Sequence, residues 1–301
     1  MILMKTKLIS ATKTGTKKIN ISIICAICVV SIISAFSFVS PIESLNINMD
    51  KGVKLPVLAY HNLSINKNNK SIYVISPEQF EQDLLHLKKS GYETISPTQL
   101  YNYVQKSEKL PKKPIMITFD DGYEGVFAYA FPLLKKYKMK AVFLPIGKKA
   151  DIFSKPNAEK NIDNSHASWK QIREMQESSF VEIGNHTYNM HTKIKGQRKG
   201  TRIKPNESLK NYKKVLREDV FNYQKEILKE TGKEPIIFAY PFGDECPESN
   251  KILKEFGFKI ILNSHESVNH IVRKKHSTIH LNRYSRACRY STTEFFKRIP
   301  K

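Results

Sequence analysis

Cysteine and acidic side chains are scarce in this chain of 301 residues. It has 4 cysteines and 28 Asp+Glu against 50 Lys+Arg, which gives a formal net charge of +22. Cys25 and Cys28 lie near the N-terminus, while Cys246 and Cys288 each follow an expected strand. This spacing excludes a zinc site built from cysteine. A disulfide between Cys246 and Cys288 and a pair of free thiols both stay open.

The basic excess is spread along the chain, without a nucleic-acid-binding motif and without internal repeats. We therefore expect no nucleic-acid partner. A protein that faces anionic wall polymers or membrane lipids accounts for the same charge. A Lys/Arg-rich stretch at 192–204 is either a solvated connector or a lip that attracts an acidic glycan.

Charge of either sign is absent from residues 19–39, which follow a basic stretch at 1–18. A largely apolar run of about 20 residues has the length needed to span a bilayer, and the preceding lysines place the N-terminus in the cytoplasm. An uncleaved anchor and a cleavable signal peptide both fit, and the length of the run favours the anchor. We expect residues 40–52 to be a linker. The domain at 53–301 would then lie outside the cytoplasm, held at the cell membrane or secreted.

The run Pro114–Phe119 ends in Asp120, Asp121 and Gly122. It predicts a buried parallel strand that delivers two carboxylates to the end of an α/β barrel where such folds place their chemistry. Neighbouring residues of a strand point in opposite directions, so the two Asp cannot share one role. A twist at Gly122 would let one carboxylate bind a metal while the other accepts a proton.

His186 and His191 follow a second short apolar run, residues 180–183. On a helix or a strand two residues at this spacing would diverge, and only a turn lets them converge. Two neutral imidazoles and one carboxylate form a three-ligand site with an open position for water, which is the pattern of catalytic zinc. Ordinary polar loop histidines are the alternative.

Apolar strands and capped helices alternate from residue 53 onward, which predicts a parallel α/β barrel. Helix starts are expected at Ser76, Ser96, Ser168 and Ser291, each followed three residues later by Gln or Glu. A long helical pattern runs from 206 to 231. The expected strands are 53–60, 92–95, 114–119, 140–146, 180–184, 235–240, 258–263 and 278–284.

Two of these stretches together resemble a known family. Thr118-Phe119-Asp120-Asp121-Gly122 and His186-Thr187-x-x-x-His191 are similar to the first two motifs of the NodB-homology polysaccharide deacetylases, carbohydrate esterase family four. The histidine spacing and Tyr60-His61 look most like the branch that removes N-acetyl groups from poly-N-acetylglucosamine. With further matches the resemblance covers residues 53 to 299. Those matches are Pro56-Val57-Leu58-Ala59-Tyr60-His61-Asn62, Ser168-Trp169 and Phe238-Ala239-Tyr240-Pro241-Phe242-Gly243.

The resemblance implies a distorted (β/α) barrel and metal-assisted hydrolysis. It implies that Asp121, His186 and His191 bind a divalent metal, expected to be zinc, and that Asp120 is the catalytic base. The substrate would be a polysaccharide of N-acetylglucosamine units at the cell surface or in the wall. An O-acetyl esterase and a non-catalytic glycan-binding protein of the same fold are the alternatives. The sequence gives no indication of an oligomeric state.

The third motif departs from the family pattern, because Ala239 stands where an Arg is expected near the base. The backbone role survives this change, since Phe242 still supplies an N–H for an oxyanion. Tyr240 and Pro241 would line the same substrate site. Arg283, at the end of the last expected strand, either replaces the missing Arg or forms a surface salt bridge.

The last family motif normally carries a Leu-x-His whose histidine protonates the leaving amine, and the chain has no good match to it. His280 would lie inside a strand. His61 ends the first expected strand, and in a closed barrel the first and last strands are neighbours. We therefore expect a permuted arrangement in which His61 is the general acid, with a histidine that merely packs at the rim as the alternative.

Overall fold

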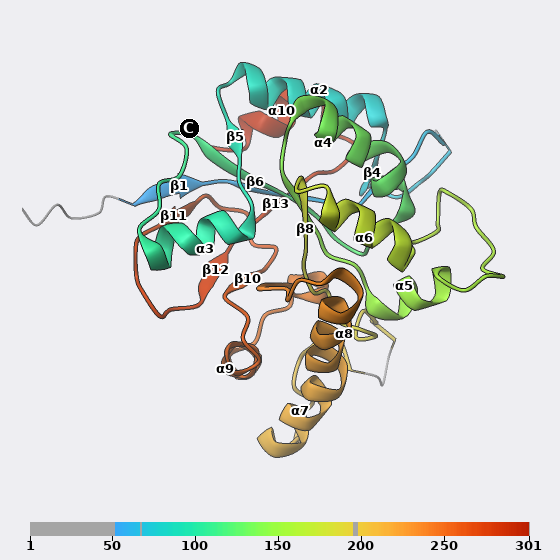
Figure 1. Cartoon of the computed structure of the whole chain (residues 1–301), viewed down its shortest axis with the longest axis vertical. Coiled ribbons are helices and arrows are strands. Elements are labelled where there is room, and N and C mark those ends of the chain that lie inside the picture. The colour runs from blue at the N-terminus through green and yellow to red at the C-terminus, as the bar shows by residue number, and fades with distance from the viewer. Residues whose placement is uncertain (1–51, 67, 195–197, 301) are drawn as a thin grey trace, which may run out of the picture. The chain divides into compact units, whose positions relative to one another are not determined.

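The computed structural model describes residues 52–66, 68–194 and 198–300 of the chain (Figure 1). The expected membrane segment at 19–39 and almost all of the expected linker therefore lie outside the described residues. Within those three ranges, no helix has both the length and the apolar character needed to cross a bilayer.

Parallel strands form a ring at the centre of the fold that stays open between β12 and β13, where no described pairing joins the two strands. β2 pairs with β6, β6 with β7 and β7 with β8, and a second group pairs in the order β9, β10, β12. Asn185, just after β8, bridges to Phe238 of β9, and β13 returns to pair with β2. The ring is the predicted barrel. Its strands are β2 (Val57–Tyr60), β6 (Pro114–Phe119), β7 (Ala141–Phe143), β8 (Val181–Ile183), β9 (Ile237–Ala239), β10 (Ile260–Leu262), β12 (Ile279–Leu281) and β13 (Tyr284–Ser285).

The expected strand at 53–60 is two strands. Pro56, which has no backbone N–H, separates β1 (Val53–Leu55) from β2. β1 leaves the parallel ring and pairs antiparallel with β11 (Asn269–Ile271), a strand that the sequence pattern missed. The pattern also missed the short pair β3 (Asn62–Leu63) and β4 (Val74–Ile75), whereas β5 (Glu93–Thr94) lies inside an expected strand.

Helices surround the ring, and the predicted caps start them. Ser76, Ser96, Ser168 and Ser291 each accept the N–H of the residue three positions later. The long helical pattern at 206–231 is α7 and α8, joined by a wide turn at Arg217–Phe221. The helices are α2 (Pro77–Lys89), α3 (Pro97–Lys106), α4 (Phe131–Tyr137), α5 (Gly147–Phe153), α6 (Trp169–Glu177), α7 (Leu209–Leu216), α8 (Asn222–Thr231), α9 (Pro247–Glu255) and α10 (Thr292–Lys297).

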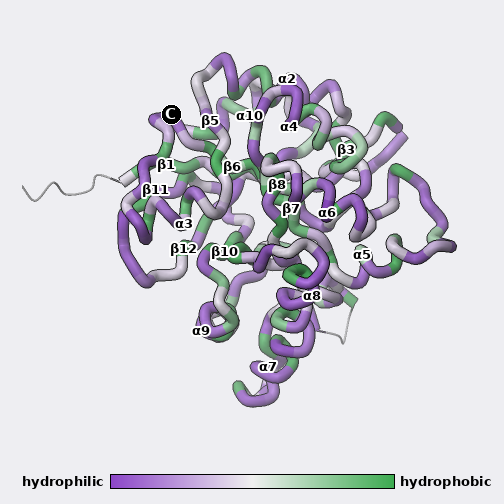
Figure 2. The backbone as a smooth tube through the Cα atoms, viewed as in Figure 1, coloured by the Kyte–Doolittle hydropathy of each residue, from purple (hydrophilic) through white to green (hydrophobic). Residues whose placement is uncertain are grey.

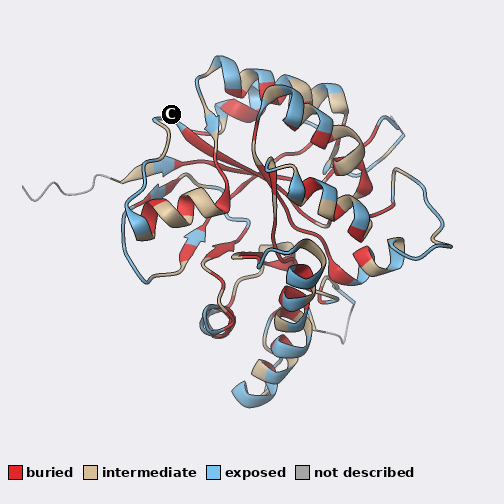
Figure 3. Cartoon of the chain, in the orientation of Figure 1, coloured by how far each residue is buried: buried red, intermediate tan, exposed pale blue. Residues whose placement is uncertain are grey.

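Apolar side chains fill both faces of the barrel wall. Figure 2 shows apolar residues concentrated on the strands, and Figure 3 shows these strands buried beneath helices with exposed outer faces. Val57 and Met116 pack in one buried cluster, while their neighbours Leu58 and Ile117 pack in another, as alternation along a strand requires. Because the interior is packed with side chains, the strand ends are the places left for a site.

The two cysteines of the described domain are both free thiols. Cys246 is buried with its Sγ 3.1 Å from the Ser249 hydroxyl, whereas Cys288 is exposed. The question left open by the sequence is therefore answered, since these cysteines do not pair.

Candidate active site

The two adjacent carboxylates lie directly after β6 and separate as predicted. The turn begins one residue earlier than expected, because Asp121 already has a positive φ of 68° and Gly122 follows at 82°. A Cβ on Gly122 would lie 2.7 Å from the Pro145 Cα, so only glycine fits this turn. Asp120 and Asp121 consequently point to different partners.

A turn held by hydrogen bonds to side chains brings the two histidines together. Thr187 adopts a positive φ of 70°, and its N–H donates to the Asn185 side chain at 2.9 Å. Behind the turn, the Asp219 carboxylate accepts the N–H groups of the next two residues. The rings of His186 and His191 end 5.1 Å apart, which confirms the expectation that only a turn would let them converge.

Asp121, His186 and His191 present three potential metal ligands to one point. Asp121 Oδ1 lies 3.4 Å from the Nε2 of His186 and 3.2 Å from the Nε2 of His191. His186 holds its Nδ1 2.9 Å from the Ala239 carbonyl, so a proton on Nδ1 leaves Nε2 with a lone pair. Asp121 Oδ1 is buried and has no hydrogen-bond donor among the described residues. A cation between these atoms would satisfy all three, so the residues fit a divalent metal.

The two histidines differ in how readily they take up a proton. Burial, together with the neighbouring His186, lowers the pKa of His191 to about 4, so this imidazole is neutral near pH 7. Burial also opposes protonation of His186, but the Asp121 and Asp120 carboxylates outweigh it and raise the pKa of that imidazole. Carboxylates that attract a proton also attract a metal ion, and the two compete for the site.

Asp120 faces a buried arginine rather than the histidines. Arg283 donates from Nη1 to Asp120 Oδ1 at 2.7 Å and from Nη2 to Oδ2 at 2.9 Å, and its Nε donates to the Asn263 carbonyl. Burial raises the pKa of Asp120, but Arg283 together with the neighbouring His186 and His61 outweighs it and lowers the pKa below its ordinary value. Arg283 is only 2% exposed, so the surface salt bridge considered from the sequence is excluded. It reaches the carboxylate that the missing Arg at position 239 would have approached.

Of the two histidines considered as acid, His61 lies with the carboxylates and His280 does not. His61 follows β2, next to β13, and its ring stacks on Tyr73 with 4.7 Å between centroids. His280 is exposed within β12, where its Nδ1 lies 3.0 Å from Glu245 Oε1. The neighbouring first and last strands are therefore found as predicted.

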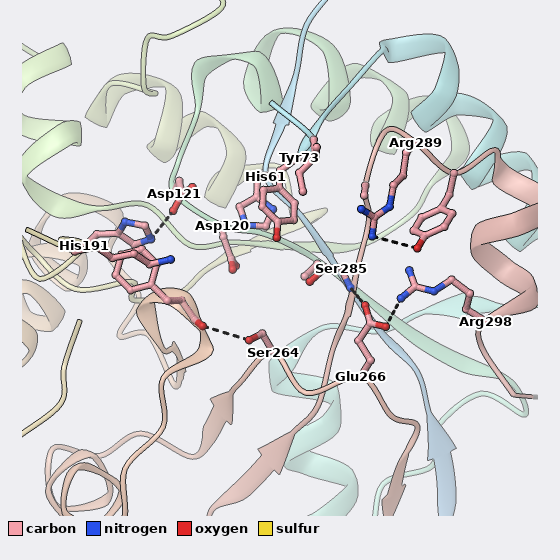
Figure 4. Close-up of a pocket in the computed structure, with 16 residues that line it drawn as sticks. His61, Tyr73, Asp120, Asp121, His191, Ser264, Glu266, Ser285, Arg289 and Arg298 are labelled. Carbon is pink, nitrogen blue, oxygen red and sulfur yellow. Dashed lines mark hydrogen bonds and ion pairs between the residues drawn. The ribbon is translucent and has the colours of Figure 1, made fainter. Parts of the chain in front are cut away.

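A cavity of about 500 Å³ opens over these groups (Figure 4). Asp120, Asp121, His191 and His61 line it, and so does Phe242, whose ring lies 4.3 Å from the ring of His191. Figure 4 places Asp121 and His191 on one side of the cavity and Arg289 and Arg298 on the opposite side. Sequence reasoning missed Tyr73, Glu266, Arg289, Tyr290 and Arg298, because they come from loops and turns without a local motif.

Two residues expected to contact substrate do not line this cavity. Tyr240 is fully buried, and its hydroxyl lies 2.6 Å from Ser249 Oγ and donates to Asn250 Oδ1. Pro241 is buried as well. The prediction of side-chain contacts from Tyr240 and Pro241 is therefore corrected, since both pack in the wall that supports Phe242.

An α/β barrel that carries three potential metal ligands and an arginine-bound carboxylate at one end has the layout of a hydrolase. Residues 107–261 match the family model for polysaccharide deacetylases, which is more than half of the chain. The chain therefore belongs to the polysaccharide deacetylase family, as its motifs implied.

Individual relatives agree with this assignment. The chain is 23% identical over 217 residues to the poly-beta-1,6-N-acetyl-D-glucosamine N-deacetylase of Escherichia coli K12, covering 67% of this chain and 32% of that protein. It is 28% identical over 193 residues to the enzyme of the same name from Staphylococcus aureus MRSA252, covering 62% of this chain and 61% of the relative. The structure of IcaB from Ammonifex degensii matches with a TM-score of 0.61 and 28% identity, covering 77% of this chain and 91% of that one. The chain thus spans about a third of the length of the first relative and less than two thirds of the second.

Proposed function

We propose that this protein is a metal-dependent de-N-acetylase that removes N-acetyl groups from N-acetylglucosamine units of a cell-surface or wall polysaccharide. The observation that carries the proposal is that the Asp121–His186–His191 site and the Arg283-bound Asp120 open into one cavity. The names of the relatives from E. coli and S. aureus support the substrate class.

Asp121, His186 and His191 would hold the metal. Two neutral imidazoles and one carboxylate suit Zn²⁺ best among common ions, although other transition metals accept the same ligands. When bound, such an ion polarises the acetamide carbonyl and lowers the pKa of a water molecule. The hydrogen bond from His186 to the Ala239 carbonyl fixes the ring so that Nε2 stays available.

Asp120 is the proton acceptor in this proposal. Its carboxylate is held in place by both nitrogens of the Arg283 fork, and it stays ionised because the arginine lowers its pKa. An ionised carboxylate beside the water that attacks the acetamide carbon can take the proton of that water. Arg283 acts through Asp120 and is therefore a positioning residue.

Phe242 and His61 complete the reaction. Phe242, at a positive φ of 61°, lies beside His191, and its N–H would donate to the oxyanion that forms at the carbonyl oxygen. His61, on the cavity wall with both carboxylates, would give a proton to the nitrogen as the C–N bond breaks. The products are acetate and a glucosamine unit with a free amine.

Counting both products tests the proposal. The purified chain is incubated with poly-N-acetylglucosamine, peptidoglycan and chitin oligosaccharides, and free acetate and free amine are measured in parallel. Equal amounts of acetate and amine are expected from at least one glycan. Acetate without amine would indicate an O-acetyl esterase, and release of neither product would contradict the proposed enzyme.

For the cellular placement, we propose that residues 19–39 anchor the chain and that residues 53–301 act outside the cytoplasm as one catalytic domain. The charge-free run at 19–39 and the lysines before it support this placement. Cell fractionation and N-terminal sequencing of the mature chain test it. Recovery in the membrane fraction with an intact N-terminus is expected, and a cleaved chain in the medium would indicate a signal peptide.

A further inference from the structure

The side of the cavity opposite the candidate metal ligands is built from basic and aromatic side chains. We call Arg289, Tyr290 and Arg298 the arginine end. The guanidinium carbons of Arg289 and Arg298 lie 4.9 and 4.6 Å from the centre of the Tyr290 ring. Figure 4 shows this end across the cavity from Asp121, with His61 and Tyr73 between them. Its place on the cavity wall puts the arginine end within reach of a glycan bound at the metal ligands.

Carboxylates of the cavity are already matched with partners. Asp120 is bound by Arg283, Asp121 faces two imidazoles, and Glu266 pairs with Arg298. Arg289 has no carboxylate partner among the residues that the structure describes, and its Nη2 donates to the Tyr290 hydroxyl at 3.2 Å. The remaining donors of this exposed guanidinium are available to a ligand.

Lys193 is another cation on the cavity wall that lies over an aromatic ring. Lys193 lies with its Nζ 4.1 Å from the centre of the Phe242 ring, and no described carboxylate pairs with it. Lys193 and Arg289 are therefore two cations on the cavity wall, one on each side, that pair with no described carboxylate. A neutral glycan would leave both cations without a counter-charge.

A smaller cavity on the other side of His61 and Tyr73 differs in chemistry. It has a volume of about 150 Å³ and is lined by the amides of Asn62, Asn69 and Asn164 and by the carboxylates of Asp121 and Asp163, with no Lys or Arg among its lining residues. Amide groups donate to and accept from sugar hydroxyls without favouring an ion. The positive charge is thus confined to one side of the candidate centre.

We propose that the glycan substrate carries a carboxylate or a phosphate group, and that this group binds Arg289 at the arginine end while an N-acetyl group lies at the Asp121 side. This inference rests on the proposed function. Arginine presents a planar fork of donors that matches two oxygens of a carboxylate or phosphate, and stacking on Tyr290 holds the fork in place. A purely neutral poly-N-acetylglucosamine would leave this contact unused.

Matched oligosaccharides test the assignment with the full-length chain in detergent. The probes are the pentamer of N-acetylglucosamine, the same pentamer oxidised to carboxylates at C6, and the same pentamer phosphorylated at O6. Affinity is measured by calorimetry, and kcat/KM is measured from acetate release. We expect the parent to favour one anionic pentamer over the neutral one by on the order of tenfold, the value of one charge-assisted contact. Whether the carboxylated or the phosphorylated pentamer gains more identifies the group.

Two variants assign the preference to a residue. Arg289→Gln should reduce the ratio of anionic to neutral affinity to about one. Arg273→Gln is the matched control, because Arg273 is also exposed and lies over a tyrosine ring, that of Tyr103, but does not line the cavity. It should keep the parental ratio.

Calorimetry separates this inference from the proposed function. If no probe releases acetate, the proposed function fails, but a tighter anionic pentamer whose advantage is lost in Arg289→Gln still supports the arginine end. Equal affinity of the parent for neutral and anionic pentamers would overturn the inference, and so would an anionic preference that survives in Arg289→Gln.

Discussion

The turn that carries His186 and His191 has two sides with opposite electrostatics. On the cavity side, the Asp120 carboxylate faces the Arg283 guanidinium. Behind the turn, Asp151 and Glu226 bring two carboxylates together. Asp151 accepts hydrogen bonds from the Tyr188 hydroxyl at 2.9 Å and from the Trp169 indole at 2.8 Å. Tyr188 belongs to the turn, so both sides bear on the same histidines.

The difference shows how carboxyl groups on the two sides of one turn take different charge states. Arg283, together with His186 and His61, outweighs burial and lowers the pKa of Asp120, which keeps an anion ready to accept a proton. Behind the turn, burial and the neighbouring Asp151 raise the pKa of Glu226 to about 7. The Asp120 carboxylate on the cavity side is thus ionised and can accept a proton, while the Glu226 carboxyl behind the turn keeps its proton up to near neutral pH.

The largest effect should come from removing a metal ligand on the cavity side. His186→Ala leaves two ligands and an unfilled position against the Ala239 carbonyl, so metal retention and activity should both be lost. Metal content is measured by elemental analysis after purification with zinc. His280→Ala, which removes an exposed histidine outside the cavity, should keep both. A full metal complement in His186→Ala would contradict the ligand assignment.

The next effect isolates the carboxylate that faces Arg283. Asp120→Asn preserves size but removes the proton acceptor, so the rate should fall by about 10²- to 10⁴-fold while metal content stays at the parental value. Asp83→Asn controls for the loss of a buried ion pair, because Asp83 is also buried against an arginine, Arg286. It should lower stability and keep the metal. Loss of metal in Asp120→Asn would mean that the two adjacent carboxylates share their roles.

A smaller loss of activity is expected from replacing His61, which lines the cavity but forms no ion pair with a described carboxylate. His61→Ala should reduce turnover of amide substrates by on the order of 10²-fold and leave the metal bound. The alkaline limb of the pH profile should change, because a general acid must be protonated when the amine leaves. Ester substrates should suffer less, since an alkoxide leaves more easily than an unprotonated amine. An active His61→Ala enzyme beside an inactive His280→Ala enzyme would move the acid to β12.

The smallest expected effect is a change in Tm on replacing Glu226, behind the turn. Because the pKa of Glu226 is raised from its ordinary value of 4.5 to about 7, the protonated form is favoured by folding. Its stabilising contribution is complete below about pH 4.5 and is lost as the pH rises towards about 7. Glu226→Gln mimics the protonated form, so it should raise Tm at pH 8 by on the order of 2 °C and leave Tm at pH 5 nearly unchanged.

Thermal melts at both pH values measure this change. Glu218→Gln is the control, because Glu218 is largely exposed and pairs only with Lys214 on its own helical segment. It should leave the pH dependence of Tm as in the parent. An equal shift of Tm at pH 5 and pH 8 in Glu226→Gln would mean that the carboxyl pair does not titrate in this range.

Local patterns accounted for much of the fold and located the candidate metal ligands. The run before Asp120 is a strand buried on both faces, while in the shorter run before His186 Val181 and Ile183 are buried and Glu182 between them is partly exposed. Ser caps began the helices, since the hydroxyl satisfies a backbone N–H that has no other acceptor. The spacing of the two histidines required a turn if they were to converge, and the structure shows that they do.

Contacts between distant segments decided the rest. The sequence by itself determined which carboxylates and imidazoles lie at strand ends, because that depends on hydrophobic runs and turns a few residues long. Only the assembled barrel decided that Arg283 would reach Asp120 across 163 positions of sequence, and that Tyr240 would pack inward. The tertiary structure alone placed Arg289 and Arg298 on the wall of the same cavity. Side-chain partners on different strands and helices are fixed by packing of the whole domain, which no short stretch of sequence encodes.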